Sequence, residues 1–260
     1  MALKFKKRPG LVAYITCGDP DLDTSCEVAL AAIHAGADVI ELGVPFSDPV
    51  ADGPVIQGAS ERALQHGTTL AGVLDVAKQI RIQSNAGLVI FSYLNPILQF
   101  GLDKFCSAAA TAGVDGVLVT DLPMEEAGDY LKAVKAHKLA PIFLAAPTST
   151  DERLKQIAKH SRGFVYAISR TGITGPRQEL TGDARSLVER LRNFTKLPIA
   201  VGFGVSTREQ FAEVGSFADA AVIGSAIVQR IEENHGREAA AVSEFLTSLV
   251  ATERPAGASV

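Results

Sequence analysis

Cysteine, histidine and tryptophan are scarce in this sequence of 260 residues, which has three cysteines, five histidines and no tryptophan. Cys17, Cys26 and Cys106 are odd in number and form no CxxC pair, a pattern typical of reduced thiols and not of a disulfide framework. The histidines show no HExxH or other ligand spacing. We therefore expect neither a bound metal nor a histidine-based catalytic triad.

Nucleotide-binding and membrane signals are missing as well. No GxGxxG follows the first predicted strand and no GxxxxGK[ST] occurs, so dinucleotide and P-loop functions have no anchor. No apolar run reaches the roughly 18 residues of a membrane span, and no signal-type segment opens the chain. The formal charge of -4 argues against nucleic-acid binding, and we interpret the basic cluster at Lys4, Lys6, Lys7 and Arg8 as a solvated leader. The expected location is cytoplasmic.

What the sequence does contain is a regular alternation of short β-rich runs and segments of helical periodicity. The runs cover residues 11–17, 38–44, 88–93, 114–120, 140–146, 163–169, 198–203 and 220–224, and helical segments include 22–37, 102–113, 125–138, 151–161, 184–195 and 208–216. Strands that each precede a helix imply a parallel sheet, and right-handed crossovers close eight such units into a barrel. A doubly wound sheet is the alternative, but it does not require eight near-regular repeats.

We therefore predict an α/β protein with one domain, a (β/α)8 TIM barrel. Its parts are an N-terminal leader at residues 1–10, the barrel at 11–251 and a flexible C-terminal tail at 252–260. The leader shows no amphipathic helix, so the sequence does not indicate how the floor of the barrel is covered.

A carboxylate stands inside the second predicted strand, DVIELGV. Glu41 has the same parity as Val39 and Gly43, so it shares one face of the strand with them. An inward-pointing Glu in a barrel is poorly solvated, which raises its pKa toward the range useful for proton transfer at neutral pH. The alternative is a structural Glu paired with a buried Lys or Arg, although the other strand runs contain neither.

Two further carboxylates, Asp48 and Asp52, lie in the loop PFSDPVADGP after this strand. Asp before Pro or Gly is ordinary turn chemistry, and each residue alone fits that reading. However, the prolines stiffen a loop that rises from the strand of Glu41, so it could hold a second carboxylate over the same pocket. Two carboxylates in different environments can divide proton transfer and charge stabilisation between them.

Glycines gather after the last three predicted strands, in SRTGITGP, GFGVS and IGSAI. In barrels these loops and the N-terminus of a short helix commonly bind phosphate, because backbone N–H groups can approach the anion there. Each glycine alone indicates no more than a turn. Together the three loops favour a phosphorylated small molecule as ligand.

The segments AYITCGDPD, GADVIELGVPFSDPVADGPVIQ, VDGVLVTDLPMEEA, GFVYAISRTGITG, VGFGVS and VIGSAIV resemble the tryptophan synthase alpha chain family in order and spacing. This resemblance implies a (β/α)8 barrel that cleaves indole-3-glycerol phosphate to indole and glyceraldehyde 3-phosphate. It makes Glu41 the catalytic acid/base and Asp52 the carboxylate that binds the indole N–H. Substrate-binding roles fall on Tyr166, Thr174, Gly175, Phe203, Gly204, Gly224 and Ser225, and Leu118 and Leu144 become candidates to line the indole pocket.

The resemblance also implies a partner, a beta subunit that carries pyridoxal phosphate, in an α2β2 complex, with no cofactor in this chain. Tyr14 and Phe91 depart from residues common in the family, so the pocket shape is expected to differ slightly. Two other classes of function stay open. One is a different phosphate-binding barrel, such as a sugar-phosphate isomerase or aldolase, and the other is a non-catalytic subunit that only activates a partner.

Overall fold

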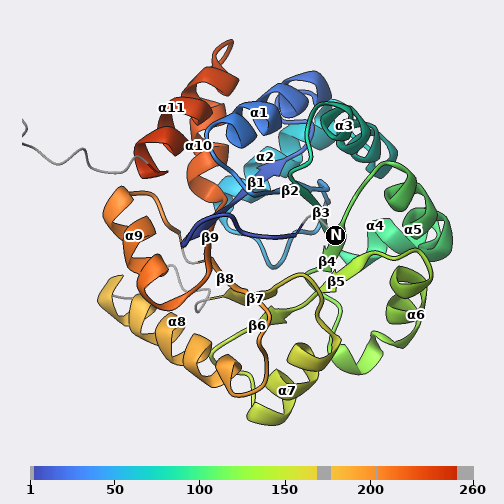
Figure 1. Cartoon of the computed structure of the whole chain (residues 1–260). Helices are drawn as coiled ribbons and strands as arrows, with labels where there is room; N and C mark the ends of the chain where they lie inside the picture. Colours follow the sequence, from blue (N-terminus) through green and yellow to red (C-terminus); the bar gives the residue numbers. More distant parts are fainter. Residues whose placement is uncertain (1–2, 169–176, 203, 251–260) are drawn as a thin grey trace, which may run out of the picture.

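The computed structural model describes residues 3–168, 177–202 and 204–250. In these residues nine parallel strands form one sheet in the order β5-β4-β3-β2-β1-β9-β8-β7-β6. The sheet curves into a nearly closed ring with the helices outside it (Figure 1). The predicted TIM barrel is therefore confirmed.

The strands match the predicted runs, except that β1 and β3 each begin one residue before the predicted start. Their bounds are β1 Gly10–Thr16, β2 Val39–Gly43, β3 Gly87–Ser92, β4 Gly116–Val119, β5 Ala140–Ile142, β6 Leu144–Ala145, β7 Val165–Ile168, β8 Ile199–Gly202 and β9 Ala220–Ile223. The single fifth strand predicted over 140–146 is wrong, since it divides at Phe143 into β5, which pairs with β4, and β6, which pairs with β7. The Phe143 ring packs edge-on against Tyr130 of helix α6, Gly128–Ala136, with 6.1 Å between ring centroids. The chain thus changes its pairing partner at Phe143, whose ring contacts one of the outer helices.

The helices surround the sheet, and several of them are each preceded by a residue whose side chain caps the first turn. Their bounds are α1 Leu22–His34, α2 Pro54–Gln65, α3 Leu70–Gln83, α4 Leu94–Phe100, α5 Leu102–Thr111, the 3-10 helix η1 Met124–Glu126, α6 Gly128–Ala136, α7 Asp151–His160, α8 Arg177–Arg192, α9 Arg208–Phe217, α10 Ser225–Glu233 and α11 Glu238–Val250. The side chains of Asp21, Thr69, Thr150 and Thr207 accept hydrogen bonds from the first turns of α1, α3, α7 and α9. Among the described helices, none has the length and apolar character to cross a membrane.

Alternate residues of each strand belong to two different cores. Leu11, Ala13 and Ile15 of β1 pack outward with the helices, whereas Val12 packs inside the ring with Val39 and its counterparts on other strands. This alternation follows from the period of two of a β-strand. The alternation decides which side chains face the barrel interior, and Glu41 lies on the same inward face of β2 as Val39.

The leader closes the end of the barrel at which the strands begin. Leu3 is 4% exposed, and the Phe5 ring lies 5.8 Å from that of Phe164 inside the barrel. A Cβ on Gly163 would lie 2.6 Å from Leu3 Cδ1 and one on Gly10 would lie 2.4 Å from Phe5 Cδ1, so both glycines make room for the leader.

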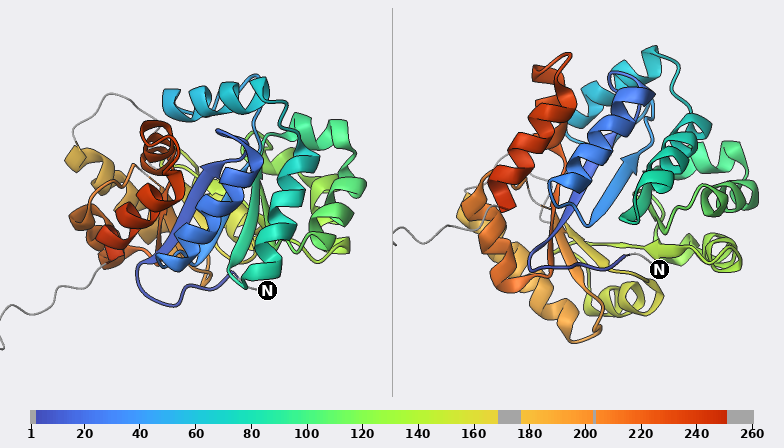
Figure 2. Two further views of the ribbon diagram at one scale, coloured as in Figure 1. Left: turned by 90° about the horizontal axis from the view of Figure 1, so that it is seen from above. Right: turned by 45° about the horizontal axis from the view of Figure 1, so that its top comes forward.

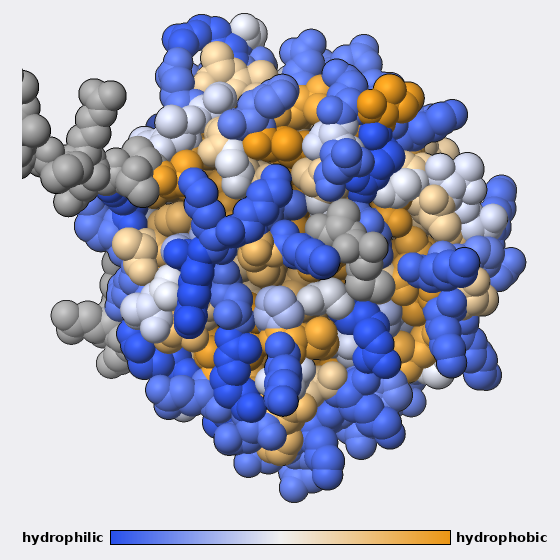
Figure 3. Space-filling view, in the orientation of Figure 1, coloured by the Kyte–Doolittle hydropathy of each residue, from blue (hydrophilic) through white to orange (hydrophobic). Residues whose placement is uncertain are grey.

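Two further views show where the leader lies relative to the rest of the barrel. The N-terminus and helix α2 lie at opposite ends of the barrel (Figure 2). The end with the leader is seen in Figure 3, where hydrophilic side chains surround the apolar ones. The leader therefore leaves the other end of the barrel open for a site.

Candidate active site

Glu41 lies inside the barrel on the second strand and is fully buried, with 0% exposure. It stands in register with Tyr14 on β1 and Val89 on β3. In the described part of the chain neither Oε1 nor Oε2 has a hydrogen-bond partner. Burial raises the pKa of this carboxyl to about 8, so it is mostly protonated at neutral pH. A lone buried carboxyl of this kind is suited to proton transfer.

The residue above Glu41 on the same face is Gly43, and its missing side chain leaves room for Tyr14. A Cβ on Gly43 would lie 2.4 Å from the Tyr14 hydroxyl oxygen. That hydroxyl is 3.4 Å from Thr16 Oγ1, and the Tyr14 ring meets Phe91 edge-on at 5.1 Å between centroids. Tyr14 thus leans over the second strand toward the open end of the barrel.

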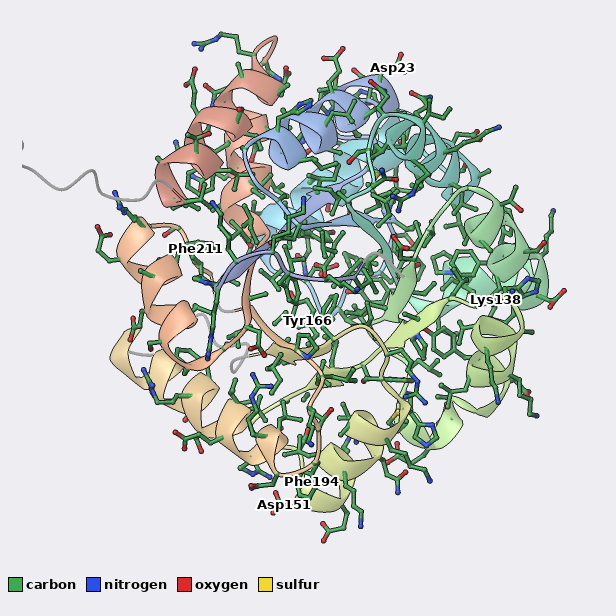
Figure 4. All side chains as sticks on the ribbon, in the orientation of Figure 1. Asp23, Lys138, Asp151, Tyr166, Phe194 and Phe211 are labelled. Atoms are coloured by element: carbon green, nitrogen blue, oxygen red, sulfur yellow. The ribbon has the colours of Figure 1, made fainter. Side chains whose placement is uncertain are left out.

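Tyr166 approaches the same space from the opposite wall, and Figure 4 shows it inside the ring of strands. A Cβ on Gly202 would lie 2.8 Å from the Tyr166 hydroxyl oxygen, so this tyrosine also rests over a glycine. Burial raises the pKa of Tyr166, and the charges of Glu41 and Asp52 and the Tyr14 group raise it further. Two carboxyl groups and two phenols therefore share one electrostatic environment.

Asp52 is held by a residue that the sequence did not single out, Tyr93. The Tyr93 hydroxyl donates a hydrogen bond of 3.0 Å to Asp52 Oδ2 and accepts one of 2.9 Å from the backbone N–H of Ala51. Burial raises the pKa of Asp52, and the hydrogen bond from Tyr93 opposes that rise. By contrast, Asp48 lies exposed and accepts a hydrogen bond of 2.6 Å from its neighbour Ser47. The signal that could have found Tyr93 is its place at the carboxyl end of the third strand.

A cavity of about 310 Å³ opens at this end of the barrel. Its lining consists of Tyr14, Ile56, Phe91, Tyr166, Gly202, Gly204, Val205, Ser206, Val222, Gly224, Ser225, Ala226 and Gln229. Glu41 and Asp52 do not themselves line it, but Tyr14, the strand neighbour of Glu41, does. The cavity volume is at the lower end of the range for small-molecule sites.

One wall of the cavity is the N-terminus of helix α10, where Gly224 is the capping residue and Ser225 the first helical residue. The backbone N–H groups of a first helical turn lack partners within the helix, and the helix dipole adds positive potential. Gly204, on the neighbouring loop, has a φ of +79°, a conformation that favours glycine. These features suit an anion such as a phosphate group.

The predicted site residues divide into three groups. Glu41, Asp52, Tyr166, Gly204, Gly224 and Ser225 lie at or beside the cavity, whereas Thr174, Gly175 and Phe203 lie outside the described residues. Leu118 is fully buried in the inner core, and Leu144 lines a neighbouring cavity with Arg153, so neither lines this cavity. A search of the described residues finds no group of three or more His, Cys, Asp or Glu placed to hold a metal ion.

Comparison with known proteins gives one answer. The family described as Tryptophan synthase alpha chain matches residues 1–255. The tryptophan synthase alpha chain of Solibacter usitatus is 52% identical over 89% of this chain and 87% of its own length, and that of Geobacter sulfurreducens is 46% identical over 95% and 94%.

Solved structures agree. A chain of the tryptophan synthase complex from Pyrococcus furiosus superimposes with a TM-score of 0.86 at 36% identity, covering 94% of this chain and 98% of that one. A chain of tryptophan synthase from Mycobacterium tuberculosis gives 0.85 at 38% identity, covering 93% of each. This chain belongs to the tryptophan synthase alpha chain family.

Proposed function

We propose that this chain cleaves indole-3-glycerol phosphate to indole and glyceraldehyde 3-phosphate, as the alpha subunit of a tryptophan synthase. The observation that carries the proposal is the state of Glu41, a buried carboxyl without a partner in the described residues, beside a cavity that ends at a helix N-terminus. A proton donor at one end and an anion site at the other match a substrate with a reactive ring and a phosphate tail.

The proton chemistry follows from the pKa of Glu41, which burial raises to about 8. The protonated carboxyl donates its proton to carbon 3 of the indole ring, and the resulting carboxylate accepts the proton of the adjacent glycerol hydroxyl. The bond between carbon 3 and the glycerol chain then breaks, and its electron pair returns to the ring. Glu41 regains its proton in this step, so the cycle is balanced.

Asp52 supports the same step from the other side of the ring. Protonation of carbon 3 places positive charge on the indole nitrogen, and an ionised carboxylate that accepts the ring N–H stabilises this charge. Tyr93 donates to one Asp52 oxygen, Oδ2, at 3.0 Å. Since a carboxylate has two oxygens, the second can accept the ring N–H.

The phosphate is assigned to the loops that carry Gly204 and Gly224 and to the first turn of α10. Gly204 and Ser225 both line the cavity, on neighbouring loops. Backbone N–H groups and the helix dipole bind the substrate and product phosphates in the same way, so this end anchors the ligand without discriminating between them.

The proposed partner is a beta subunit that binds pyridoxal phosphate and receives the indole in an α2β2 complex. The solved relatives from Pyrococcus furiosus and Mycobacterium tuberculosis, which are tryptophan synthases, support this assignment. The cofactor would belong to that subunit. Cys17, Cys26 and Cys106 are buried and free, in keeping with the reducing cytoplasm proposed as the location.

The test is to incubate the purified chain with indole-3-glycerol phosphate, alone and with a beta subunit, and to follow indole release. We expect indole from the chain alone and faster release in the complex. A chain that activates the beta subunit equally well as parent and as Glu41→Gln, without releasing indole, would be a non-catalytic activator. Conversion of a sugar phosphate in place of indole-3-glycerol phosphate would instead indicate an aldolase or isomerase.

A further inference from the structure

Arg62 of helix α2 joins three segments that surround the cavity. Its Nε and Nη2 donate hydrogen bonds of 2.8 Å each to the two carboxylate oxygens of Asp19, in the loop after β1. Its Nη1 donates a hydrogen bond of 2.9 Å to Oε1 of Glu232, near the C-terminus of α10. Asp19 is 4% exposed, so this part of the network is shielded from solvent.

Helix α2 is connected to the part of the site that contains Asp52. The helix begins two residues after Asp52, and its Gln57 side chain donates a hydrogen bond of 2.8 Å to the Asp52 backbone oxygen. Ile56, one residue earlier, lines the cavity. A shift of α2 therefore moves the Asp52 carboxylate relative to the barrel.

Helix α10 is connected to the anion end of the site, because its first residue, Ser225, lines the cavity. The two helices pack together in a small cluster that includes Ala59 of α2 and Val228 of α10. Arg62 and Glu232 lie about one turn further along their helices than Ala59 and Val228. The Arg62 hydrogen bonds thus link α2 and α10 on the side of their contact that lies away from the ligand.

We propose that Arg62 is a positioning residue that fixes the distance between the Asp52 loop and the phosphate-binding end of α10. A substrate with a ring at one end and a phosphate at the other needs both ends of the site at a set separation. A ligand that carries the phosphate alone needs only one end. This inference rests on the proposed function, since it concerns the span of that substrate.

The experiment compares a spanning ligand with a fragment. In the full chain with a beta subunit, Arg62→Met should lower kcat/KM for indole-3-glycerol phosphate by about ten- to a hundredfold, as expected for a reacting group displaced by a fraction of an ångström to 1 Å. The dissociation constant of glycerol 3-phosphate should change by less than about twofold, because this fragment binds only the phosphate end and does not depend on the distance between the two ends.

Arg81→Met is the matched control. Arg81 of α3 also makes three hydrogen bonds, to Gly113 O at 2.9 Å, Ser84 O at 3.1 Å and Asp115 Oδ2 at 2.7 Å. It lies away from the cavity, so its loss should lower thermal stability while leaving kcat/KM within about twofold of parent. A general loss of stability would affect both variants alike.

A second variant covers the case in which Arg62→Met fails to fold, since that change leaves the buried Asp19 unpaired. Glu232→Ala removes only the bond to α10, and Glu232 is 47% exposed. It should also lower kcat/KM, by a smaller factor than Arg62→Met, and again leave the affinity for glycerol 3-phosphate unchanged.

Several results would overturn the inference. The first is unchanged kcat/KM in Glu232→Ala when Arg62→Met either also keeps its kcat/KM or fails to fold. The second is that Arg62→Met weakens glycerol 3-phosphate binding by the same factor as it lowers kcat/KM. The third is an equal loss of kcat/KM in Arg81→Met. An inactive parent would overturn the proposed function and this role of Arg62 with it, whereas an active parent with unaffected variants would overturn the role of Arg62 alone.

Discussion

The hydroxyl of Tyr93 joins the end of the third strand to the loop of the second strand, donating to Asp52 Oδ2 at 3.0 Å. The Tyr93 hydroxyl oxygen also accepts a hydrogen bond of 2.9 Å from the backbone N–H of Ala51, and Phe46 packs on the Tyr93 ring with 5.1 Å between centroids. Tyr93 is 3% exposed and therefore well fixed. The Asp52 carboxylate is thus oriented by a strand and not by its own loop alone.

Tyr93→Phe should lower kcat/KM for indole-3-glycerol phosphate by about tenfold or more, because a hydrogen bond to a charged group contributes about 1.5–3 kcal/mol. Loss of the bond should also raise the pKa of Asp52, since the Tyr93 hydroxyl lowers it. The check is the acidic limb of the pH profile of kcat/KM, which should move to higher pH.

Tyr130→Phe is a suitable control for this experiment. The Tyr130 hydroxyl donates a buried hydrogen bond of 2.8 Å to Val117 O, away from the cavity. We expect it to reduce stability by about 1 kcal/mol with little effect on turnover. Equal kinetic effects of the two substitutions would argue against an orienting role for Tyr93.

Glu41→Gln should lower kcat by a factor of about 10² to 10⁴, the usual contribution of a general acid or base. The amide keeps the shape of the side chain but does not exchange a proton with the substrate. Equilibrium binding of glycerol 3-phosphate should be nearly unchanged, because the phosphate end is built from other residues. Near-parental indole release by the variant would remove Glu41 from the mechanism.

That Glu41 shares one face of its strand with Val39 and Gly43 could be predicted from the sequence, because a strand has a strict period of two. Inside a barrel of apolar strands, that parity decides whether a side chain faces the interior or the helices. The barrel itself followed from the alternation of strands and helices. Such features depend on local sequence pattern, and the structure reproduces them.

Features that depend on contacts between distant segments could not be predicted in the same way. The bond from Tyr93 to Asp52 requires the path of the loop, which no periodicity describes. The strand break lies at Phe143, whose ring packs against Tyr130 of α6, a contact that the local sequence pattern does not describe. Likewise, the floor is closed by Leu3 and Phe5 without a helix over the described part of the leader, residues 3–9, because Gly163, just before β7, and Gly10 of β1 leave room for them.

Gly43→Ala should impair the site by displacing Tyr14. A Cβ at this position would lie 2.4 Å from the Tyr14 hydroxyl oxygen and 2.6 Å from Tyr14 Cζ, so the ring must move. Overpacking of this kind costs about 1–3 kcal/mol, and the displaced ring would enter the cavity. We expect a higher KM for the substrate, measured by steady-state kinetics.

Gly53→Ala is the matched control for Gly43→Ala, because a Cβ on Gly53 has no atom within 4 Å. Gly53 has a φ of -77°, which any residue adopts. The control should therefore keep parental kinetics. If both alanine variants behaved like the parent, the close packing of Tyr14 over Gly43 would have no part in shaping the cavity.

Stability should depend on pH through Glu41 in a defined direction. Burial raises the pKa of this carboxyl from 4.5 to about 8, so the folded protein holds a proton that the unfolded chain has released between these values. Where the folded state binds more protons, the free energy of unfolding falls as pH rises. The contribution of Glu41 is fully present below pH 4.5 and is lost as pH rises to about 8.

Glu41→Gln isolates this effect, because its amide does not titrate. Urea unfolding of parent and variant between pH 5 and 9 should show the parent losing stability relative to the variant by up to about 1.4 kcal/mol per pH unit below pH 8, with a constant difference above it. All other titrating groups are common to both proteins and cancel in the difference. Parallel stability curves over the whole range would mean that Glu41 has the same pKa in the folded and unfolded states. That result would contradict the proposal that Glu41 is a proton donor with a raised pKa.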